Sequence, residues 1–329
     1  MGATSTAVSF PNVDRATIHI AFGVDANYFR GMGVNIVSII KNNPNLIFVF
    51  HVFAFSITKD IECRLKKLEN NYNVLINVNI LNKQILSNFS KFPCFSQHSL
   101  GTFIRILIPN LLHGIVDKVL YLDADILCMG NIEELISIDL KNTIAAVVTD
   151  EIKTTVTTQI SILKLPHSEY FNAGVMYINI DNWVKHDSQN KSLNVLTTRS
   201  LRFADQDALN VVLNGHTTYI DKKWNFRYHL IDFLSSGEKI FNMQEKVLFM
   251  HFTGPVKPWH SWCLHEAKLN FLEYQKLSSW SDMPLDKPHT ARELKLFSRF
   301  LIKQGRVIEG IYWHIVYWWT KFINLKKQN

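Results

Sequence analysis

The 329-residue chain contains few cysteines, and they are widely spaced. No two of its four cysteines form a Cys-x-x-Cys pair. A disulfide framework and a structural zinc site both need closer or more regular spacing. We therefore expect reduced thiols in a cytoplasmic protein, at Cys63, Cys94, Cys128 and Cys263.

Long apolar runs are also missing. The longest, residues 46–57 and 311–319, are shorter than the roughly 20 residues that a transmembrane helix requires. Residues 1–15 show no basic segment followed by an apolar run, so no signal peptide is visible. The expected location is the cytoplasm.

Neither of the common glycine-rich nucleotide loops is present. The chain has no GxxxxGK[ST] motif, and in the segment Gly31-Met32-Gly33 the third glycine of a dinucleotide fingerprint is replaced by Ile36. These glycines also follow the first predicted strand by six or more residues. A nucleotide would need a different holder, such as a metal ion that bridges a diphosphate.

The composition and the order of patterns predict an α/β fold. The hydrophobic content of 47% and the charged content of 19% describe a globular protein with a sizeable core. Predicted strands alternate with predicted helices, which favours a mostly parallel sheet with helices on both faces. We expect strands at 17–25, 46–57, 74–81, 117–128 and 143–149, and helices at 34–41, 58–70 and 99–112, with a short helix after Gly130-Asn131.

Two aspartates interrupt the apolar run 117–128. Asp123 and Asp125 are two residues apart, so in an extended backbone their side chains point to the same side. Neighbouring carboxylates repel each other unless a cation or a proton joins them, and paired oxygen ligands suit Mg²⁺ or Mn²⁺. The alternative is that one aspartate caps the next helix while the other binds loop amides.

Further polar residues follow other predicted strands. Asp25, Asn27 and Asp150 lie just after strand ends, where open parallel sheets bind their ligands. In the second half, the segment 170–177 predicts a small-residue turn opening a strand, so that the backbone can approach a ligand. Asp205-Gln206-Asp207 begins a predicted amphipathic helix, where either acid could also serve as an N-cap.

The segment 248–260 ends a predicted strand in a histidine, a glycine and a lysine. A lone histidine at a strand end is usually structural. The combination of His251, Gly254 and Lys257 instead indicates a metal ligand, a close backbone approach and a cation for phosphate oxygens.

Four motifs together give the chain a family resemblance. Leu-Asp-Ala-Asp (122–125), Phe-Asn-Ala-Gly (171–174), Asp-Gln-Asp (205–207) and His-Phe-Thr-Gly-Pro-Val-Lys-Pro-Trp-His (251–260) occur in one chain. In this set and order, the chain resembles the retaining glycosyltransferases of family 8, in the branch that builds the lipopolysaccharide core. The resemblance runs from about Ile18 to the C-terminus. It implies a GT-A fold, a single Rossmann-like nucleotide-binding domain, and a UDP-sugar donor.

The resemblance also implies roles for individual residues. Asp123, Asp125 and His251 match the metal ligands, and Asp123 also lies near the ribose. Ala26 departs from the acid found there in some relatives, which loosens the nucleoside contacts without removing a metal ligand. The implied donor-site residues are Asp25 and Asn27 for the uridine, Tyr28 for stacking on uracil, Gly254 and Lys257 for the diphosphate, Arg105, Asn172, Asp205 and Gln206 for the donor hexose, Asp150 for donor or acceptor hydroxyls, and Gly23 and Ala124 as neighbours of the nucleotide.

The same parts suggest a reaction. A bound Mn²⁺ or Mg²⁺ together with Lys257 would neutralise the charge that develops on the leaving β-phosphate. No pair of carboxylates of the retaining-hydrolase kind is apparent, and Gln206 is a poor nucleophile. We therefore favour front-face transfer over a covalent intermediate. The opening segment 23–28 resembles the glucosyltransferases of this branch, which implies UDP-glucose as the donor, with UDP-galactose as the alternative.

Two other functions are compatible with parts of the sequence. A nucleotidyltransferase should show a glycine-rich basic loop after the first strand, and residues 29–33 are a poor example. The second is a membrane-associated protein that binds nucleotide sugars but has lost catalysis. The presence of Asp123, Asp125 and His251 argues against it.

The C-terminal segment has its own character. Residues 285–329 carry nine Lys or Arg against three acids, and tryptophans and tyrosines cluster in 311–321. A basic amphipathic helix of this kind is typical of a membrane interface. The alternative is a helix packed on the core with a solvated basic face, and no recognisable nucleic-acid fold accompanies the charge. We predict a catalytic domain at 1–280 and a membrane-associating extension at 281–329, peripheral on the cytoplasmic face of the inner membrane, with a lipopolysaccharide core acceptor.

Overall fold

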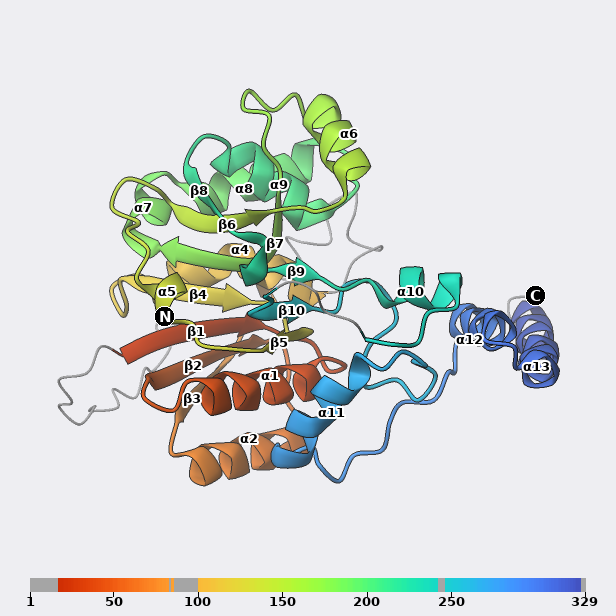
Figure 1. The fold of residues 1–329 in the computed structure, drawn as a ribbon. Coiled ribbons are helices and arrows are strands. Elements are labelled where there is room, and N and C mark those ends of the chain that lie inside the picture. Colours follow the sequence, from red (N-terminus) through yellow and green to blue (C-terminus); the bar gives the residue numbers. More distant parts are fainter. Residues whose placement is uncertain (1–16, 83, 86–99, 242–245, 327–329) are drawn as a thin grey trace.

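A computed structural model describes residues 17–82, 84–85, 100–241 and 246–326 (Figure 1). Its centre is a seven-stranded sheet with the order β3-β2-β1-β4-β7-β6-β8. Four neighbouring strand pairs are parallel, and β7 is antiparallel to both of its neighbours. The α/β fold with a mostly parallel sheet is therefore confirmed. The strands are β1 Thr17–Gly23, β2 Ile47–Ala54, β3 Leu75–Ile80, β4 Lys118–Leu122, β6 Ala145–Thr149, β7 Phe171–Asn179 and β8 Thr217–Ile220.

Helices cover both faces of this sheet. Buried side chains of α1 and α2 form a core with one face, and those of α4, α7, α8 and α9 form a second core with the other face. Figure 1 shows the two helical layers above and below the strands. The helices of the main body are α1 Phe29–Asn42, α2 Lys59–Tyr72, α4 Leu100–Leu112, α5 Glu133–Ile136, α6 Lys153–Leu163, α7 Ile180–Lys185, α8 Ser188–Thr198, α9 Ala204–Leu213, α10 Leu230–Ser236 and α11 Lys268–Leu277, with a short 3₁₀ helix at Lys222–Trp224.

The predicted strand 117–128 is two strands in two sheets, so that prediction was wrong. Strand β4 ends at Leu122, and β5 (Ile126–Cys128) belongs to a separate sheet with the order β5-β10-β9. Strand β10 (Phe249–His251) pairs antiparallel with β5 and parallel with β9 (Phe226–Arg227). The chain must leave the large sheet to make these pairs. Asp123 and Asp125 consequently lie in the turn between the sheets, not on one extended strand.

The first helix begins earlier than the sequence suggested. Helix α1 starts at Phe29, not at residue 34, and it includes both glycines of the rejected nucleotide loop. A side chain at Gly31 would lie 2.4 Å from the Ala124 carbonyl oxygen, and one at Gly33 would lie 2.0 Å from the Trp280 ring. These glycines allow close packing of the helix, which the sequence pattern alone does not reveal.

The segment 170–177 is not a turn that opens a strand. Residues 171–177 all lie within β7, whose pairing with β6 shifts register at the point where Val147 pairs with Met176 and Val148 pairs with Asn172. Residues 173–175 therefore bulge away from β6, as in other β-bulges beside binding sites.

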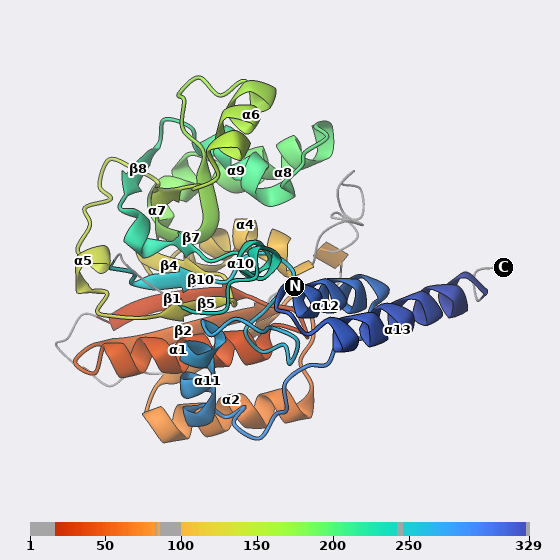
Figure 2. The same ribbon diagram turned by 45° about the vertical axis from the view of Figure 1, so that its right-hand side comes forward.

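The C-terminal region is a helical hairpin that projects from the body (Figure 2). Helix α12 (Ala291–Lys303) begins with a capping box between Thr290 and Glu293. Helix α13 (Val307–Lys326) packs back on α12, and the Ser298 hydroxyl donates to the Gly310 carbonyl oxygen at 2.7 Å. The predicted helical extension is thus present. Among the described residues, none of the helices has the combination of length and apolarity that a membrane span requires.

Candidate metal and nucleotide site

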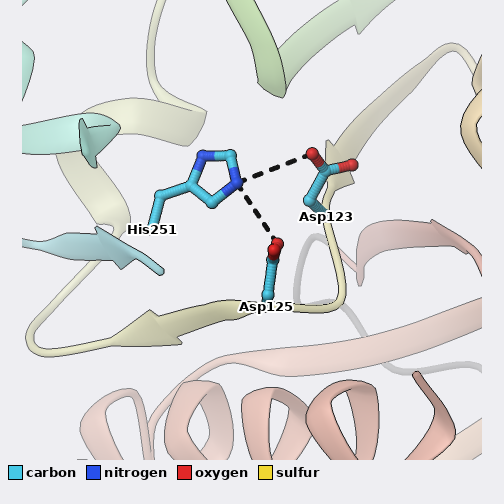
Figure 3. Close-up of side chains that lie close together, drawn as sticks. All are labelled: Asp123, Asp125 and His251. Atoms are coloured by element: carbon cyan, nitrogen blue, oxygen red, sulfur yellow. Dashed lines mark ion pairs between the residues drawn. The ribbon is translucent and has the colours of Figure 1, made fainter. Parts of the chain in front are cut away.

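Three potential metal ligands meet where the two sheets adjoin (Figure 3). Nε2 of His251 lies 3.2 Å from Oδ1 of Asp125 and 3.6 Å from Oδ2 of Asp123, and one ligand atom from each residue lies within 4.8 Å of the others. The aspartates come from the β4–β5 turn, and the histidine comes from the end of β10. Two carboxylates with one imidazole suit Mn²⁺, and the carboxylates also suit Mg²⁺. In the described structure neither aspartate caps a helix, so that alternative is not supported.

Lysine 257 supplies the nearest positive charge. Its Nζ lies 2.5 Å from Oδ2 of Asp125 and donates to the Phe252 carbonyl oxygen at 2.8 Å. Burial disfavours both charges, but each stabilises the other. The pKa of the Asp125 carboxyl is therefore lowered by Lys257 and His251, and the pKa of Lys257 is raised by Asp125, both against the effect of burial. The Asp125 carboxyl is therefore ionised at neutral pH.

Arginine 105 forms ion pairs with both the candidate metal site and the Asp205-Gln206-Asp207 motif. Its Nη2 lies 2.9 Å from Oδ1 of Asp123, and its Nε lies 2.9 Å from Oδ2 of Asp205. Burial raises the pKa of Asp205 to about 7, an effect that Arg105 opposes. Burial lowers the pKa of Arg105, but Asp123 and Asp205 outweigh this and raise it overall. Arg105 thus keeps its charge between two carboxyl groups.

The bulge in β7 holds this arrangement with its peptide groups. The Ala173 carbonyl oxygen accepts from Nη1 of Arg105 at 2.8 Å, and the Gly174 carbonyl oxygen accepts from the backbone N–H of Asp123 at 2.8 Å. A side chain at Gly174 would lie 2.3 Å from Cε1 of His251. Position 174 therefore has to be glycine for the histidine ring to lie where it does.

The amide of Gln206 lies behind the bulge. Its Oε1 accepts from Nδ2 of Asn172 and from the backbone N–H of Ala173. Its Nε2 donates to the Tyr170 hydroxyl at 3.1 Å and to Asp150 at 3.4 Å. Both ends of the Gln206 amide are consequently held by the protein.

The two other acids of this region have different partners. Asp150 is buried and pairs with Nη1 of Arg227 at 2.6 Å. Asp207 accepts from the backbone N–H groups of residues 202 and 203, just before helix α9. Neither acid is the N-cap of α9, which is Phe203. Asp207 instead holds the backbone before the helix, whereas Asp205 faces Arg105.

The turn after β1 borders two adjoining cavities. Oδ1 of Asp25 accepts from the backbone N–H of Asn27 and holds the turn. Tyr28 lines both cavities, and Asn27 and Lys257 line the larger one, of about 660 Å³. The smaller cavity, of about 190 Å³, is lined by Gly23, Asp25, Tyr28, Gly101, Thr102, Arg105, Asp123, Ala124 and Asp125.

Gly254 lies in the loop between His251 and Lys257. Its φ of +84° is in the left-handed region, and a side chain there would lie 2.4 Å from Nε2 of His229. Backbone conformation and packing are sufficient reasons for a glycine at this position. Gly254 is not among the residues that line either cavity.

Sequence reasoning missed two polar residues beside the site, the buried Asn225 and the partly buried Arg227. Arg227 pairs with Asp150, and Asn225 lies 2.9 Å from both His251 and Asn172. They come from the short segment before and within β9, which carries no recognisable motif. The one usable signal concerns Arg227: a buried aspartate such as Asp150 needs a partner of opposite charge.

The fold is that of a glycosyltransferase of the GT-A type, and the three potential metal ligands are compatible with this class. The chain matches the family described as Glycosyl transferase family 8 over residues 19–263, and its C-terminal counterpart over residues 268–321. The chain therefore belongs to glycosyltransferase family 8, as the resemblance implied.

Similar proteins include two lipopolysaccharide enzymes. The lipopolysaccharide 1,3-galactosyltransferase of Salmonella typhimurium is 32% identical over 317 residues, covering 94% of this chain and 93% of that protein. A lipopolysaccharide 1,2-glucosyltransferase of Escherichia coli K12 is 30% identical, covering 93% and 91%. Among solved structures, the galactosyltransferase LgtC in complex with donor and acceptor sugar analogs has a TM-score of 0.64 at 24% identity, covering 80% of this chain and 96% of that one. At this level of identity, the similarity to LgtC shows a shared fold.

Proposed function

We propose that this protein transfers a hexose from a UDP-sugar to a hydroxyl group of the lipopolysaccharide core, with retention of anomeric configuration and with UDP-glucose as the favoured donor. The observation that carries the proposal is the convergence of Asp123, Asp125 and His251 in a family 8 chain. The names of the relatives, which include both glucosyl- and galactosyltransferases of lipopolysaccharide, support the acceptor class. They leave UDP-galactose as the second candidate donor.

The protein groups around the triad have assignable tasks. Asp123, Asp125 and His251 would hold Mn²⁺ or Mg²⁺, and the bound ion would supply positive charge against a leaving diphosphate. Lys257 lies beside Asp125, which stabilises its charge against the effect of burial, and it would add to that stabilisation. Tyr28 offers an aromatic face to the uracil.

The hexose would be held on the other side of the triad. Arg105, Asn172, Asp205, Gln206 and Asp150 are the proposed residues for its hydroxyl groups and for those of the acceptor. The Gln206 amide already makes hydrogen bonds through both ends, and Asp205 is paired with Arg105. Neither is a free nucleophile, which favours front-face transfer over a covalent intermediate.

The test is a donor screen on the purified protein. UDP-glucose and UDP-galactose are compared with a truncated core acceptor, with Mn²⁺, with Mg²⁺ and with a chelator, and NMR of the product gives linkage and anomeric configuration. Metal-dependent transfer with retention is expected. A glycosyl adduct trapped on Asp205 and identified by mass spectrometry would refute the front-face mechanism. If neither transfer nor metal-dependent hydrolysis of either donor occurs, the silent binding protein becomes the better description.

We further propose that the extension from residue 281 associates peripherally with the cytoplasmic face of the inner membrane. Helix α13 exposes large apolar side chains at helical spacing, and Tyr and Trp on this face are typical of membrane interfaces. The adjacent basic residues favour anionic lipids. The exposed apolar residues of α13 include Ile308, Ile311, Tyr312, Ile315, Trp318, Trp319 and Phe322.

Sedimentation with lipid vesicles tests this surface. The full chain should bind vesicles containing anionic lipid more tightly than zwitterionic ones, and Ile315→Glu should weaken the binding at least about tenfold. Ile162→Glu on α6 is the matched control, because Ile162 is 62% exposed and Ile315 is 63% exposed. Equal binding by both variants would refute the assignment to α13.

A further inference from the structure

We infer that Asn225 is a positioning residue that fixes the tautomer of His251, so that the Nε2 lone pair faces the two aspartates. Asn225 is 1% exposed and lies before β9. Its two side-chain polar atoms contact His251 on one side and Asn172 on the other. The inference rests on the proposed metal role of His251 and names the group that controls it.

The argument starts from two backbone N–H groups of β7, because a backbone N–H can only donate. The Gly174 N–H lies 3.1 Å from one polar atom of the Asn172 side chain, which must therefore be the acceptor Oδ1. The Ala173 N–H lies 3.2 Å from Gln206, so the Gln206 atom there must be the acceptor Oε1. Nδ2 of Asn172 donates to that oxygen at 3.1 Å. Two consecutive peptide groups thus fix the Asn172 amide from both of its ends.

The orientation of Asn172 then determines that of Asn225. Oδ1 of Asn172 can only accept, and it lies 2.9 Å from Asn225, so the Asn225 atom facing it must be the donor Nδ2. This Nδ2 is also 3.4 Å from the Asn172 carbonyl oxygen, a second acceptor. A flipped Asn225 amide would place oxygen against two oxygens in a buried region, where an unmade hydrogen bond is costly.

The remaining atom of Asn225 decides the state of the histidine. Oδ1 of Asn225 lies 2.9 Å from Nδ1 of His251. Since this oxygen can only accept, the ring must carry a proton on Nδ1. Nε2 is then the nitrogen available to a metal ion, and it is the ring nitrogen that faces Asp123 and Asp125 in Figure 3. Partners of this kind on the far nitrogen of a metal-binding histidine typically change metal affinity by 10–100-fold.

Metal affinity provides the first test. Free Mn²⁺ is measured by electron paramagnetic resonance during titration of the full chain. Asn225→Ala should weaken Mn²⁺ binding by roughly 10–100-fold. Asn210→Ala is the matched control, because Asn210 is also a 1% exposed asparagine and, within the described part of the chain, its side chain bonds only to backbone groups of Phe171 and Gln206. It should leave Mn²⁺ affinity within about threefold of the wild type.

The tautomer provides the second test. In the Cd²⁺-loaded protein labelled with ¹⁵N-histidine, His251 is identified by its absence from a His251→Gln sample. We expect a protonated Nδ1 and a metal-bound Nε2. Two results would overturn this inference but not the proposed metal site. One is a metal-bound Nδ1, and the other is wild-type Mn²⁺ affinity in Asn225→Ala together with weakened Mn²⁺ affinity in His251→Gln. Unchanged affinity in His251→Gln would overturn the proposed metal site as well.

Discussion

The sharpest single perturbation of the site is the addition of one methyl group at Gly174. In Gly174→Ala the new Cβ would lie 2.3 Å from Cε1 and 2.7 Å from Nδ1 of His251. Ordinary contacts of this kind begin at 3.4 Å, so the ring would have to retreat by about 1 Å. The new Cβ cannot relieve the clash by moving toward Asn172, because Oδ1 of Asn172 already lies 3.0 Å from it.

That displacement should be more damaging to metal binding than to folding. Metal–nitrogen distances tolerate a deviation of only about 0.2 Å, so we expect Mn²⁺ affinity to fall by about 100-fold or more. Overpacking of this size should lower the free energy of unfolding by about 1–3 kcal/mol. Transfer activity at limiting Mn²⁺ should fall in parallel with the affinity.

The assay is Mn²⁺ titration followed by electron paramagnetic resonance, with circular dichroism to establish folding. Gly130→Ala is the matched control. Its Cβ would meet Leu248 Cδ2 at 2.6 Å, which is the end of a flexible side chain outside the metal site. A folded Gly174→Ala protein with wild-type Mn²⁺ affinity would show that the ring position is not constrained by this contact, and the reasoning would be wrong.

Three further predictions concern charge, pH and packing. Asp125→Asn should keep the fold and abolish detectable transfer, and chemical unfolding should show a loss of about 2 kcal/mol, because buried Lys257 loses its ionised partner. Burial lowers the pKa of His51 to about 4. Between about pH 6.5 and pH 4, the His51 imidazole is therefore protonated in the unfolded chain but mostly neutral in the folded chain. The free energy of unfolding should therefore fall by about 1.6 kcal/mol between pH 6.5 and 5 through this group, and His51→Gln should reduce that slope in urea titrations. Gly33→Ala places a Cβ 2.0 Å from the fully buried Trp280 ring, and thermal unfolding should show a loss of about 3 kcal/mol.

Local patterns were sufficient to predict most elements of the fold. Strand β2 (Ile47–Ala54) is apolar except for His51 and lies inside the sheet, whereas β3 (Leu75–Ile80) alternates and lies at the edge. Periodicity reports burial, and burial follows from these positions. The order of the early elements followed from the same patterns.

Features that depend on distant partners were not predictable. The separation of β4 from β5 depends on pairing with β10, more than 100 residues later. The bulge in β7 likewise depends on its register with β6. Asn225 and Arg227 take their roles from contacts with Asn172, His251 and Asp150. No local spacing distinguishes such residues from other buried polar groups.

The bulge of β7 has a consequence for how sequences of this kind can diverge. It holds Arg105 and the Asp123 backbone through carbonyl oxygens of residues 173 and 174, and a point mutation does not delete a peptide group. A substitution at position 173 therefore changes a side chain but keeps the two carbonyl oxygens that hold Arg105 and the Asp123 backbone. The side chains of Arg105, Asn172 and Gln206, by contrast, are tied to the site by their own contacts. Sequences built on such a strand can therefore vary at a position that acts only through its peptide group while the candidate metal site keeps its backbone support.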